Sequence, residues 1–470
     1  MTGGTFQAAI EIVALAVITI GVLQSLLYAV QLAVAGVALS QRPPLPRVGM
    51  LWERYADVAP PVSVLVPAFN EERSIIDSVR SILSLQYPGL QVVVVSDGST
   101  DGTVERLVSA FGMSESDTLP QPALPHEAVT ATYTSDIESR LVVVDKANGG
   151  KSDALNCAIT YARSPLVCTI DADSILEADA LLRAVAPFIE DPERTVAVGA
   201  TIRVANGCRI VGGRVVEIGV PRKALPLFQT IEYLRAFLMA RLAWSRIGAL
   251  TIVSGAFGLF RRNIVVEVGG YSTGTVGEDF ELIIKLHRHL IDKKQDYRIA
   301  YIPEPVCWTE VPESLGQLGK QRSRWHRGAM ETFFKHRKML LNPRYGRVGT
   351  LGFLNMLLVD VLSPIAELLG YLIIPLAWAT GILSLDYFLA FTALTFAFGI
   401  FISAGALVME EVELRRFPRA RDLRVLFVAS VLENIGYRQI NNFWRVRGMI
   451  QFIGRRRGWG HLDRKGFGSA

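Results

Sequence analysis

The sequence predicts an α/β domain, a sheet flanked by helices, combined with α-helical transmembrane segments. Short β-branched runs alternate with helix-like stretches between residues 61 and 347, the order typical of strands covered by helices. Long apolar segments lie on both sides of this region, and half of the 470 residues are hydrophobic, more than we expect of an ordinary soluble enzyme. The chain therefore predicts an α/β domain held at a lipid bilayer.

Charge and cysteine content narrow the class of protein further. The net charge is +5, and the basic residues cluster beside the apolar segments. This favours anionic lipid headgroups or phosphorylated substrates, and we expect no nucleic-acid partner because no basic groove motif is evident. The four cysteines are scattered without a Cys-x-x-Cys pair, so we expect reduced thiols and neither zinc nor disulfides.

Composition divides the chain into five regions. We predict an N-terminal transmembrane helix at 1–40, a proline-rich linker at 41–60, a cytosolic catalytic domain at 61–347, a C-terminal membrane region at 348–454 and a basic tail at 455–470. No Lys or Arg precedes the first apolar segment, whereas Arg42, Arg47 and Arg54 follow it. The positive-inside rule then places the amino terminus outside and the catalytic domain in the cytoplasm, in a multi-pass protein of the inner or plasma membrane.

The C-terminal membrane region contains two predicted spans and one ambiguous segment. Leu351–Leu385 is long enough for an interfacial turn followed by a span, and Tyr387–Val408 is a second span. The loop Glu410–Arg424 carries five arginines, so we expect it in the cytoplasm. Val425–Phe452 mixes apolar and charged residues. We favour a re-entrant or interfacial segment over a third span, which would leave the arginines at 455–457 outside.

Within the catalytic domain the apolar runs predict individual strands and helices. We predict strands at Val62–Val66, Val92–Val95, Leu141–Val144 and Val167–Ile170, and later ones near Val196–Val204 and Arg298–Ile302. Helices are expected at Glu71–Leu85, Thr103–Ala110, Lys151–Arg163 and Thr230–Ile247, with another opening at Glu278. Gly112–Ser139 lacks periodicity and is expected to be a surface insertion.

The strand Val167–Ile170 ends at two carboxylates, Asp171 and Asp173. The carboxyl edge of an open α/β sheet is where ligands bind, and two close carboxylates repel each other unless a cation lies between them. Hard oxygen ligands select Mg²⁺ or Mn²⁺, which keep coordination sites open for a diphosphate. The alternative is an acidic turn in which Asp173 or Ser174 caps the next helix.

Three other predicted strands end in residues suited to ligand binding. The first runs into Pro67-Ala68-Phe69-Asn70-Glu71, where Asn70 is a candidate N-cap, and it has no Gly-x-Gly-x-x-Gly, which disfavours a dinucleotide-binding dehydrogenase. The second ends in Asp97-Gly98-Ser99-Thr100-Asp101, and the alternative is that these residues only form a turn, which their types also favour. The third ends in Asp145-Lys146-Ala147-Asn148-Gly149-Gly150-Lys151, where lysines beside glycines at a helix start suit a phosphate, although a solvated basic loop has the same composition.

Taken together in this order, the motifs resemble the inverting family 2 glycosyltransferases with the GT-A fold, which has a Rossmann-like mixed sheet. More narrowly, the chain looks like the membrane-embedded group that contains cellulose, chitin, hyaluronan and poly-N-acetylglucosamine synthases. The resemblance covers Pro61 to Gly328 and includes two later motifs, Gly277-Glu278-Asp279 and Gln321-Arg322-Ser323-Arg324-Trp325. Each motif alone is weak evidence for this family, whereas the set of motifs in this order is specific for it.

The resemblance implies a role for each matching residue. Asp279 would be the general base, and Asp171 and Asp173 would bind Mg²⁺ or Mn²⁺. The donor, a UDP-sugar, would be bound by Pro67, Phe69, Glu71, Asp97, Lys151, Asp171 and Arg324. The acceptor would be bound by Ser254, Gly255, Glu278, Gln321, Arg322 and Trp325. Helix-dipole pairing is the alternative for the acids at 278 and 279, and an amphipathic basic helix is the alternative for 321–327.

The sequence departs from the family pattern at two places. Thr251–Phe257 differs from the cellulose-synthase form Phe-Phe-Cys-Gly-Ser, which leaves the identity of the acceptor open. The tail Arg457-Gly458-Trp459-Gly460-His461 is only loosely similar to the Trp-Gly-Thr-Arg of hyaluronan synthases, so we assign it no gating role.

The resemblance implies metal-dependent β-glycosyl transfer from a UDP-sugar to a growing polysaccharide at the membrane, processive and coupled to export by a partner that the sequence does not identify. The alternative is a non-processive glycolipid synthase with a lipid acceptor, because few spans are available to line a polymer channel. A membrane scaffold that has lost catalysis is the third possibility, and the presence of all three carboxylates argues against it.

Overall fold

The computed structural model describes residues 2–42, 48–118, 120–121, 124–414, 417 and 419–455. Three prolines of the predicted linker (Pro43, Pro44 and Pro46), Arg415, Arg416 and the tail from 456 onward lie outside the described residues. The described chain forms two compact units, which we call the sheet unit (42–221 and 250–311) and the helical unit (2–41, 222–249 and 312–455). Residues 222–249 and 312–347 thus group with the apolar helices, and the predicted domain limits of 61–347 remain a prediction.

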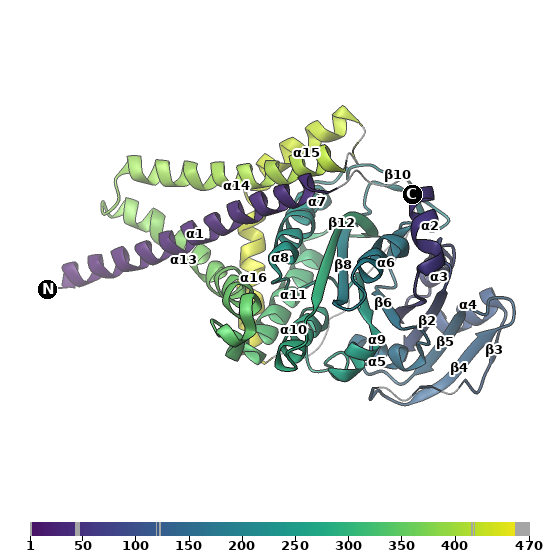
Figure 1. The fold of residues 1–470 in the computed structure, drawn as a ribbon. Coiled ribbons are helices and arrows are strands. Elements are labelled where there is room, and N and C mark those ends of the chain that lie inside the picture. The colour runs from purple at the N-terminus through teal and green to yellow at the C-terminus, as the bar shows by residue number, and fades with distance from the viewer. Residues whose placement is uncertain are drawn as a thin grey trace. The chain divides into compact units, whose positions relative to one another are not determined.

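The sheet unit is built on one mixed sheet with the strand order β3-β4-β5-β2-β1-β6-β11-β8-β12-β7 (Figure 1). The strands are β1 (Val62–Ala68), β2 (Leu90–Asp97), β3 (Met113–Glu115), β4 (Val129–Ser135), β5 (Leu141–Lys146), β6 (Leu166–Ile170), β7 (Ser174–Leu176), β8 (Thr195–Val204), β11 (Phe257–Arg261) and β12 (Arg298–Thr309). All six predicted strands are present. Their apolar side chains are almost completely buried, as expected for strands covered on both faces.

The four central strands run parallel in the order β5-β2-β1-β6. Their carboxyl ends therefore lie along one edge of the sheet, as the sequence predicts. Strand β11 is antiparallel to β6, and Phe257 at its start pairs with Ile170 at the end of β6. The segment that precedes β11 consequently reaches the same edge as the residues that follow β6.

The helices of the sheet unit are α2 (Val48–Tyr55), η1 (Ala56–Val58), α3 (Ile75–Leu83), α4 (Thr103–Phe111), α5 (Lys151–Tyr161), α6 (Ala180–Glu190), α9 (Arg262–Glu267) and α10 (Glu278–Asp292). They include every helix predicted within this unit. Helices α2 and η1 occupy the part of the predicted linker that is described. A short hairpin, β9 (Arg209–Val211) and β10 (Arg214–Glu217), forms a second, two-stranded sheet.

The structure differs from three local interpretations of the sequence, one of them an alternative. The expected surface insertion Gly112–Ser139 contains two strands, β3 and β4, which extend the sheet beyond β5. Alternating threonines make β4 only half-buried, so its apolar signal is weak although threonine favours strands. Asn70 is no N-cap: it has a positive φ of 55°, its side-chain oxygen accepts from the Thr100 amide at 2.7 Å, and α3 begins later. The helix-cap alternative for Asp173 and Ser174 also fails, since Ser174 begins β7.

The helical unit contains α1 (Thr2–Ser40), α7 (Ala224–Tyr233), η2 (Leu234–Arg241), α8 (Leu242–Ile247), α11 (Leu315–Lys335), η3 (Arg337–Met339), η4 (Pro343–Tyr345), η5 (Val348–Gly352), α12 (Phe353–Asn355), η6 (Met356–Leu362), α13 (Ser363–Ala379), α14 (Leu385–Glu413), α15 (Ala420–Leu432) and α16 (Tyr437–Ile453). The predicted helix at 230–247 corresponds to α7, η2 and α8 in succession. Helix α1 packs against α13 and α14.

Three helical segments of the described chain are long and apolar enough to cross a membrane: Ile10–Ser40, Val348–Ala379 and Leu385–Val412. They correspond to the predicted N-terminal helix and the two predicted C-terminal spans, and they give the chain the features of a membrane protein. The ambiguous segment Val425–Phe452 is divided between α15 and α16 by a break at 433–436, where Gly436 has a φ of 84°.

Candidate active site at the carboxyl edge of the sheet

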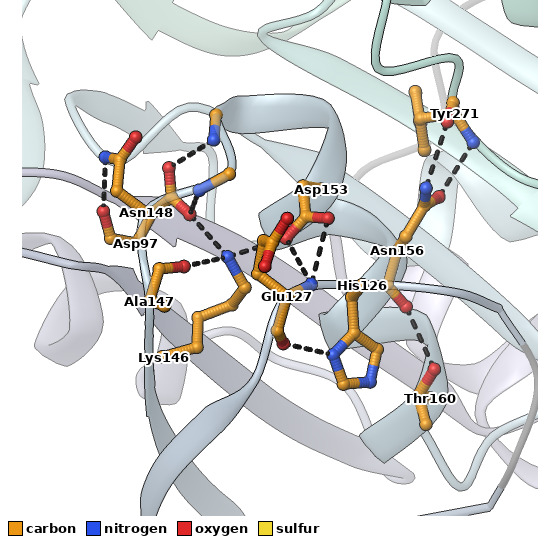
Figure 2. A network of polar contacts seen from close by, with 12 residues as sticks. Asp97, His126, Glu127, Lys146, Ala147, Asn148, Asp153, Asn156, Thr160 and Tyr271 are labelled. Carbon is orange, nitrogen blue, oxygen red and sulfur yellow. Dashed lines mark hydrogen bonds and ion pairs between the residues drawn. The ribbon is translucent and has the colours of Figure 1, made fainter.

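Asp97, at the end of β2, binds the loop that follows the neighbouring strand β5. Its carboxylate accepts from the backbone amides of Gly149 at 3.0 Å and Gly150 at 2.7 Å, while its backbone oxygen accepts from the Asn148 side chain at 2.7 Å (Figure 2). These bonds fix the loop that leads into α5. Asp97 therefore lies at the predicted edge, and in this structure it is engaged by the protein itself.

Lys146, at the end of β5, lies between two carboxylates. Its ammonium group is 2.6 Å from Asp97 and 2.6 Å from Asp153, and its side chain is completely buried (Figure 2). Burial alone would lower the pKa of Lys146, but its bonds to Asp153 and Asp97 outweigh burial and raise that pKa. Asp153 also accepts from the Glu127 amide, so one buried lysine ties together β2, α5 and the segment before β4.

Lys151, five residues further on, connects the two groups of acids predicted to act in catalysis. Its ammonium group lies 2.5 Å from Asp171 and 3.3 Å from Glu278. Burial lowers the pKa of Lys151, but the nearby carboxylates of Asp171, Glu278 and Asp279 have the larger combined effect and raise it. Burial raises the pKa of Glu278 to about 7, against the lowering effect of Lys151. The lysine is thus held charged between strand β6 and helix α10.

Gly255 lies against this cluster because the segment before β11 reaches the same edge. A Cβ atom at this position would be 3.1 Å from Lys151 Nζ and 3.4 Å from Asp279 Oδ2. Asp279 is half-buried in the first turn of α10. The predicted base, the predicted donor lysine and the predicted acceptor segment are therefore brought together in the sheet unit. Ser254, the other predicted acceptor residue of this segment, is buried and accepts from the Ala256 amide at 3.2 Å.

Asp171 and Asp173 follow β6 directly and are both half-buried. In the described part of the chain, no group of three or more His, Cys, Asp or Glu side chains is arranged to hold a metal ion. Two carboxylates are nevertheless a suitable donor set for Mg²⁺ or Mn²⁺ when substrate phosphates supply further oxygens, which is how Mg²⁺ is commonly bound. The residues present fit a cation that binds together with a diphosphate.

The remaining predicted donor residues lie at the end of β1. Pro67 belongs to the strand, and Phe69 is 47% exposed, so its ring is accessible for stacking. The Glu71 carboxylate accepts from the Ser74 hydroxyl at 2.6 Å. Since β1 lies between β2 and β6 in the sheet, these residues belong to the same edge as Asp97 and Asp171.

The predicted residues Gln321, Arg322, Arg324 and Trp325 lie on α11 of the helical unit. Arg322 is buried, its guanidinium donates to Glu232 at 2.8 Å, and it lies over the Trp325 ring at 4.4 Å from the centroid. Trp325 is 43% exposed, and Gln321 and Arg324 are half-buried. The motif therefore forms an ordered Arg–Trp pair on one helix.

The expectation that Lys146 suits a phosphate was wrong, because its ammonium group is buried between Asp97 and Asp153. Its partner Asp97 was recoverable in principle, because the two residues pair in register at the ends of adjacent parallel strands. The sequence did not reveal Asp153, Glu232 or Tyr437, whose hydroxyl donates to Glu232 at 2.6 Å. Glu232 and Tyr437 are 90 and 115 residues from Arg322, and their proximity depends on the packing of α7 and α16.

Comparison with known families agrees with this fold. The family described as "Glycosyl transferase family group 2" matches residues 166–403, slightly more than half of the chain, and "Glycosyl transferase family 2" matches 63–120. The chain therefore belongs to the family 2 glycosyltransferases. A mannosyltransferase from Pyrobaculum calidifontis, solved with GDP-Man and Mn²⁺, has a similar fold, with a TM-score of 0.56 and 18% identity over 96% of this chain and 99% of that one.

Among proteins of known name, the chain is similar to poly-β-1,6-N-acetyl-D-glucosamine synthases of staphylococci. It is 29% identical over 58% of its length to that of Staphylococcus epidermidis and 30% identical over 60% to that of Staphylococcus aureus strain COL. The matches cover 56% and 59% of those proteins, so they span a little over half the length of each relative.

Proposed function

We propose that the protein is an inverting, metal-dependent glycosyltransferase that builds a β-linked polysaccharide from a UDP-sugar at the membrane. The observation that carries this proposal is the cluster at the carboxyl edge, where Lys151 lies between Asp171 and Glu278 and where Gly255 adjoins Asp279. The name of the staphylococcal relatives favours N-acetylglucosamine as the sugar and a growing polymer as the acceptor. Processive synthesis with export is part of the same proposal.

The chemistry assigns a separate task to each side of the cluster. An acceptor hydroxyl attacks the anomeric carbon of the donor while the bond from that carbon to the diphosphate breaks, and the nucleotide leaves with the bonding electrons. The hydroxyl proton passes to the Asp279 carboxylate, which acts as the general base. Lys151 keeps its positive charge beside Asp171, where it can bind a phosphate oxygen of the donor.

Asp171 and Asp173 are the residues that would hold Mg²⁺ or Mn²⁺. A bound divalent cation stabilises the negative charge that develops on the departing diphosphate. Phe69 offers an exposed ring on which a base can stack. In the helical unit, the proposed acceptor role of Gln321, Arg322 and Trp325, and the donor role of Arg324, are supported by the family motif, since an indole face suits stacking on a sugar ring.

The first experiment measures nucleotide release by the detergent-purified full chain with UDP-N-acetylglucosamine, UDP-glucose and GDP-mannose, in Mn²⁺, in Mg²⁺ and in chelator. We expect release with one UDP-sugar, loss of release in chelator, and a labelled product of high molecular mass. Asp171→Asn and Asp173→Asn should weaken metal binding and so raise the metal concentration needed for half-maximal release. Asp292→Asn, at the exposed end of α10, should leave that concentration unchanged. Absence of release with every donor from a folded protein would reject the proposal.

A non-processive glycolipid synthase is the second candidate function. The observation that favours it is the number of candidate spans, three in the described chain, which are few to line a channel for a polymer. The size of the product separates the two functions. A short, lipid-extractable product would establish the glycolipid synthase, and a high-mass, water-soluble product would reject it.

A further inference from the structure

We propose that Glu232 and Tyr437, which lie outside the family motif, are positioning residues that hold the Arg322–Trp325 pair of α11 in place for acceptor binding. This inference rests on the proposed function, because it takes Trp325 as a contact for the sugar acceptor. It adds two residues, from α7 and from the start of α16, to the three α11 residues that are proposed to bind the acceptor.

One carboxylate oxygen of Glu232 receives two hydrogen bonds. Arg322 Nη2 donates to Glu232 Oε2 at 2.8 Å, and the Tyr437 hydroxyl donates to the same oxygen at 2.6 Å. Arg322 is 4% exposed and Tyr437 is 6% exposed, so both donors are buried, while the Glu232 side chain is 21% exposed. Charge-assisted hydrogen bonds in such surroundings are short and directional, and they restrict the guanidinium to one position.

The restricted guanidinium in turn restricts the indole. Arg322 Cζ lies 4.4 Å from the centre of the Trp325 ring, within the range of a cation–π contact. The two residues are three positions apart on one helix, so their side chains share a face. Trp325 remains 43% exposed, and its exposed surface is available to a ligand. Glu232 therefore acts on the indole through Arg322.

Tyr437 owes its position to close packing between α11 and α16. The Ser323 hydroxyl donates to the Trp444 backbone oxygen at 3.1 Å, and a Cβ atom on Gly319 would come within 2.6 Å of the Trp444 indole nitrogen. The Tyr437 ring also contacts Phe228 of α7, with ring centroids 5.4 Å apart. The hydroxyl that fixes Glu232 is thus held by three helices.

The same stretch of helix carries a second ion pair toward the break between α15 and α16. Arg235, one turn after Glu232, pairs with Glu433 and donates to the Ser403 hydroxyl at 2.6 Å. Arg235 also interacts electrostatically with Glu232. Glu433, Arg235, Glu232 and Arg322 therefore alternate in charge. Removing the charge of Glu232 would leave the buried Arg322 without this acid, whereas the half-buried Arg235 would keep Glu433.

The test compares Glu232→Gln with Tyr437→Phe and with a matched control, Glu313→Gln. Glu313 also accepts from a basic residue of the same unit, Lys223 at 2.6 Å, but this pair is largely exposed. With short β-linked N-acetylglucosamine oligosaccharides as acceptor, we expect Glu232→Gln to raise the acceptor KM about tenfold with kcat within twofold. We expect a smaller rise for Tyr437→Phe and none for Glu313→Gln. An unchanged acceptor KM in Glu232→Gln would overturn the proposal.

A second readout does not depend on activity. The difference in acrylamide quenching between the native chain and Trp325→Phe isolates the signal of Trp325 from that of the other tryptophans. We expect Glu232→Gln to increase the quenching of Trp325 by about twofold, since a released indole is more accessible. Unchanged quenching would overturn the positioning role even if the acceptor KM rose.

The two readouts separate the failure of this inference from failure of the proposed function. If the native chain releases no nucleotide from any donor, the proposed function fails, while quenching still decides whether Glu232 positions Trp325. If Glu232→Gln does not fold, Tyr437→Phe carries the test, because it removes one hydroxyl and leaves both charges in place. Increased quenching in Tyr437→Phe then supports the proposal, and unchanged quenching rejects it.

Discussion

Substitution of Lys146 by methionine should destabilise the sheet unit strongly. Methionine has a similar length and no charge, so the substitution removes the only cation that contacts both Asp97 and Asp153 in the described chain while leaving the two carboxylates buried. Removing one partner of a buried ion pair costs about 3–5 kcal/mol. In a unit of this size each kcal/mol lowers the unfolding midpoint by about 2–4 °C, so we expect a decrease of about 10 °C.

The measurement is thermal unfolding of the full chain in detergent, followed by intrinsic fluorescence. Arg140→Met is the matched control: Arg140 pairs with Glu138 at 2.7 Å, but the pair is partly exposed, and such pairs contribute about 0–1 kcal/mol. The double variant Lys146→Met with Asp153→Asn should recover part of the loss, because only one buried carboxylate then lacks a cation. A Lys146→Met midpoint within 2 °C of the native one, on the order of the effect expected for the control, would refute the reasoning.

Three further predictions concern the neighbouring residues. Asp279→Asn should lower nucleotide release by about 10²–10⁴-fold while donor affinity, measured by calorimetry, stays the same, and equal losses in both would contradict a role as general base. Gly255→Ala should reduce kcat with little effect on the unfolding midpoint, because the added methyl meets Lys151 Nζ at 3.1 Å, whereas Gly274→Ala, which meets nothing within 4 Å, should be neutral in both assays. Burial lowers the pKa of His287 to about 4. As the pH falls, the unfolded chain therefore takes up a proton at this residue before the folded chain does. Stability should decrease by about 3 kcal/mol between pH about 6.5 and 4, and His287→Gln should flatten this decrease in pH-dependent unfolding midpoints.

Much of the sheet could be predicted from the sequence because buried parallel strands are continuous apolar runs. Val92–Val95 and Val167–Ile170 are short, β-branched and bounded by turn residues, and both are strands. The position of Asp171 followed from the same pattern, since a carboxylate that ends such a run lies at the carboxyl edge. The apolar helices were equally clear, because length and composition alone define them.

The features that sequence reasoning missed depend on contacts between distant segments. Asn70 adopts a positive φ because its side chain bonds to Thr100, and a cap motif read from the local sequence does not include that bond. Strand β4 has threonines at positions where apolar residues would have predicted a strand. Its extended conformation is stabilised by pairing with β5. In the sequence, Glu232 looks like an ordinary acidic residue of a helix. Its hydrogen bond from Tyr437 depends on the position of α16.

Lys146 and Lys151 illustrate how neighbouring residues of one type come to serve different purposes. Lys146 points into the unit and is bonded to Asp97, Asp153 and the Ala147 backbone oxygen, so its three ammonium protons all have acceptors in the protein. Lys151 begins α5 and lies at the carboxyl edge beside Asp171 and Glu278, with part of its side chain exposed.

Lys146 helps to fix the loop that precedes Lys151. Lys146 neutralises Asp97, and Asp97 then holds the amides of Gly149 and Gly150, the two residues that precede Lys151. Gly150 has a φ of 90°, a conformation that favours glycine, and the two hydrogen bonds to Asp97 help to hold the loop in it. Loss of Lys146 should therefore reduce donor binding as well as stability, because Lys146 contacts Asp97, one of the predicted donor residues. A Lys146→Met variant that is destabilised but binds UDP with native affinity at 10 °C would show that the loop holds its conformation without Lys146.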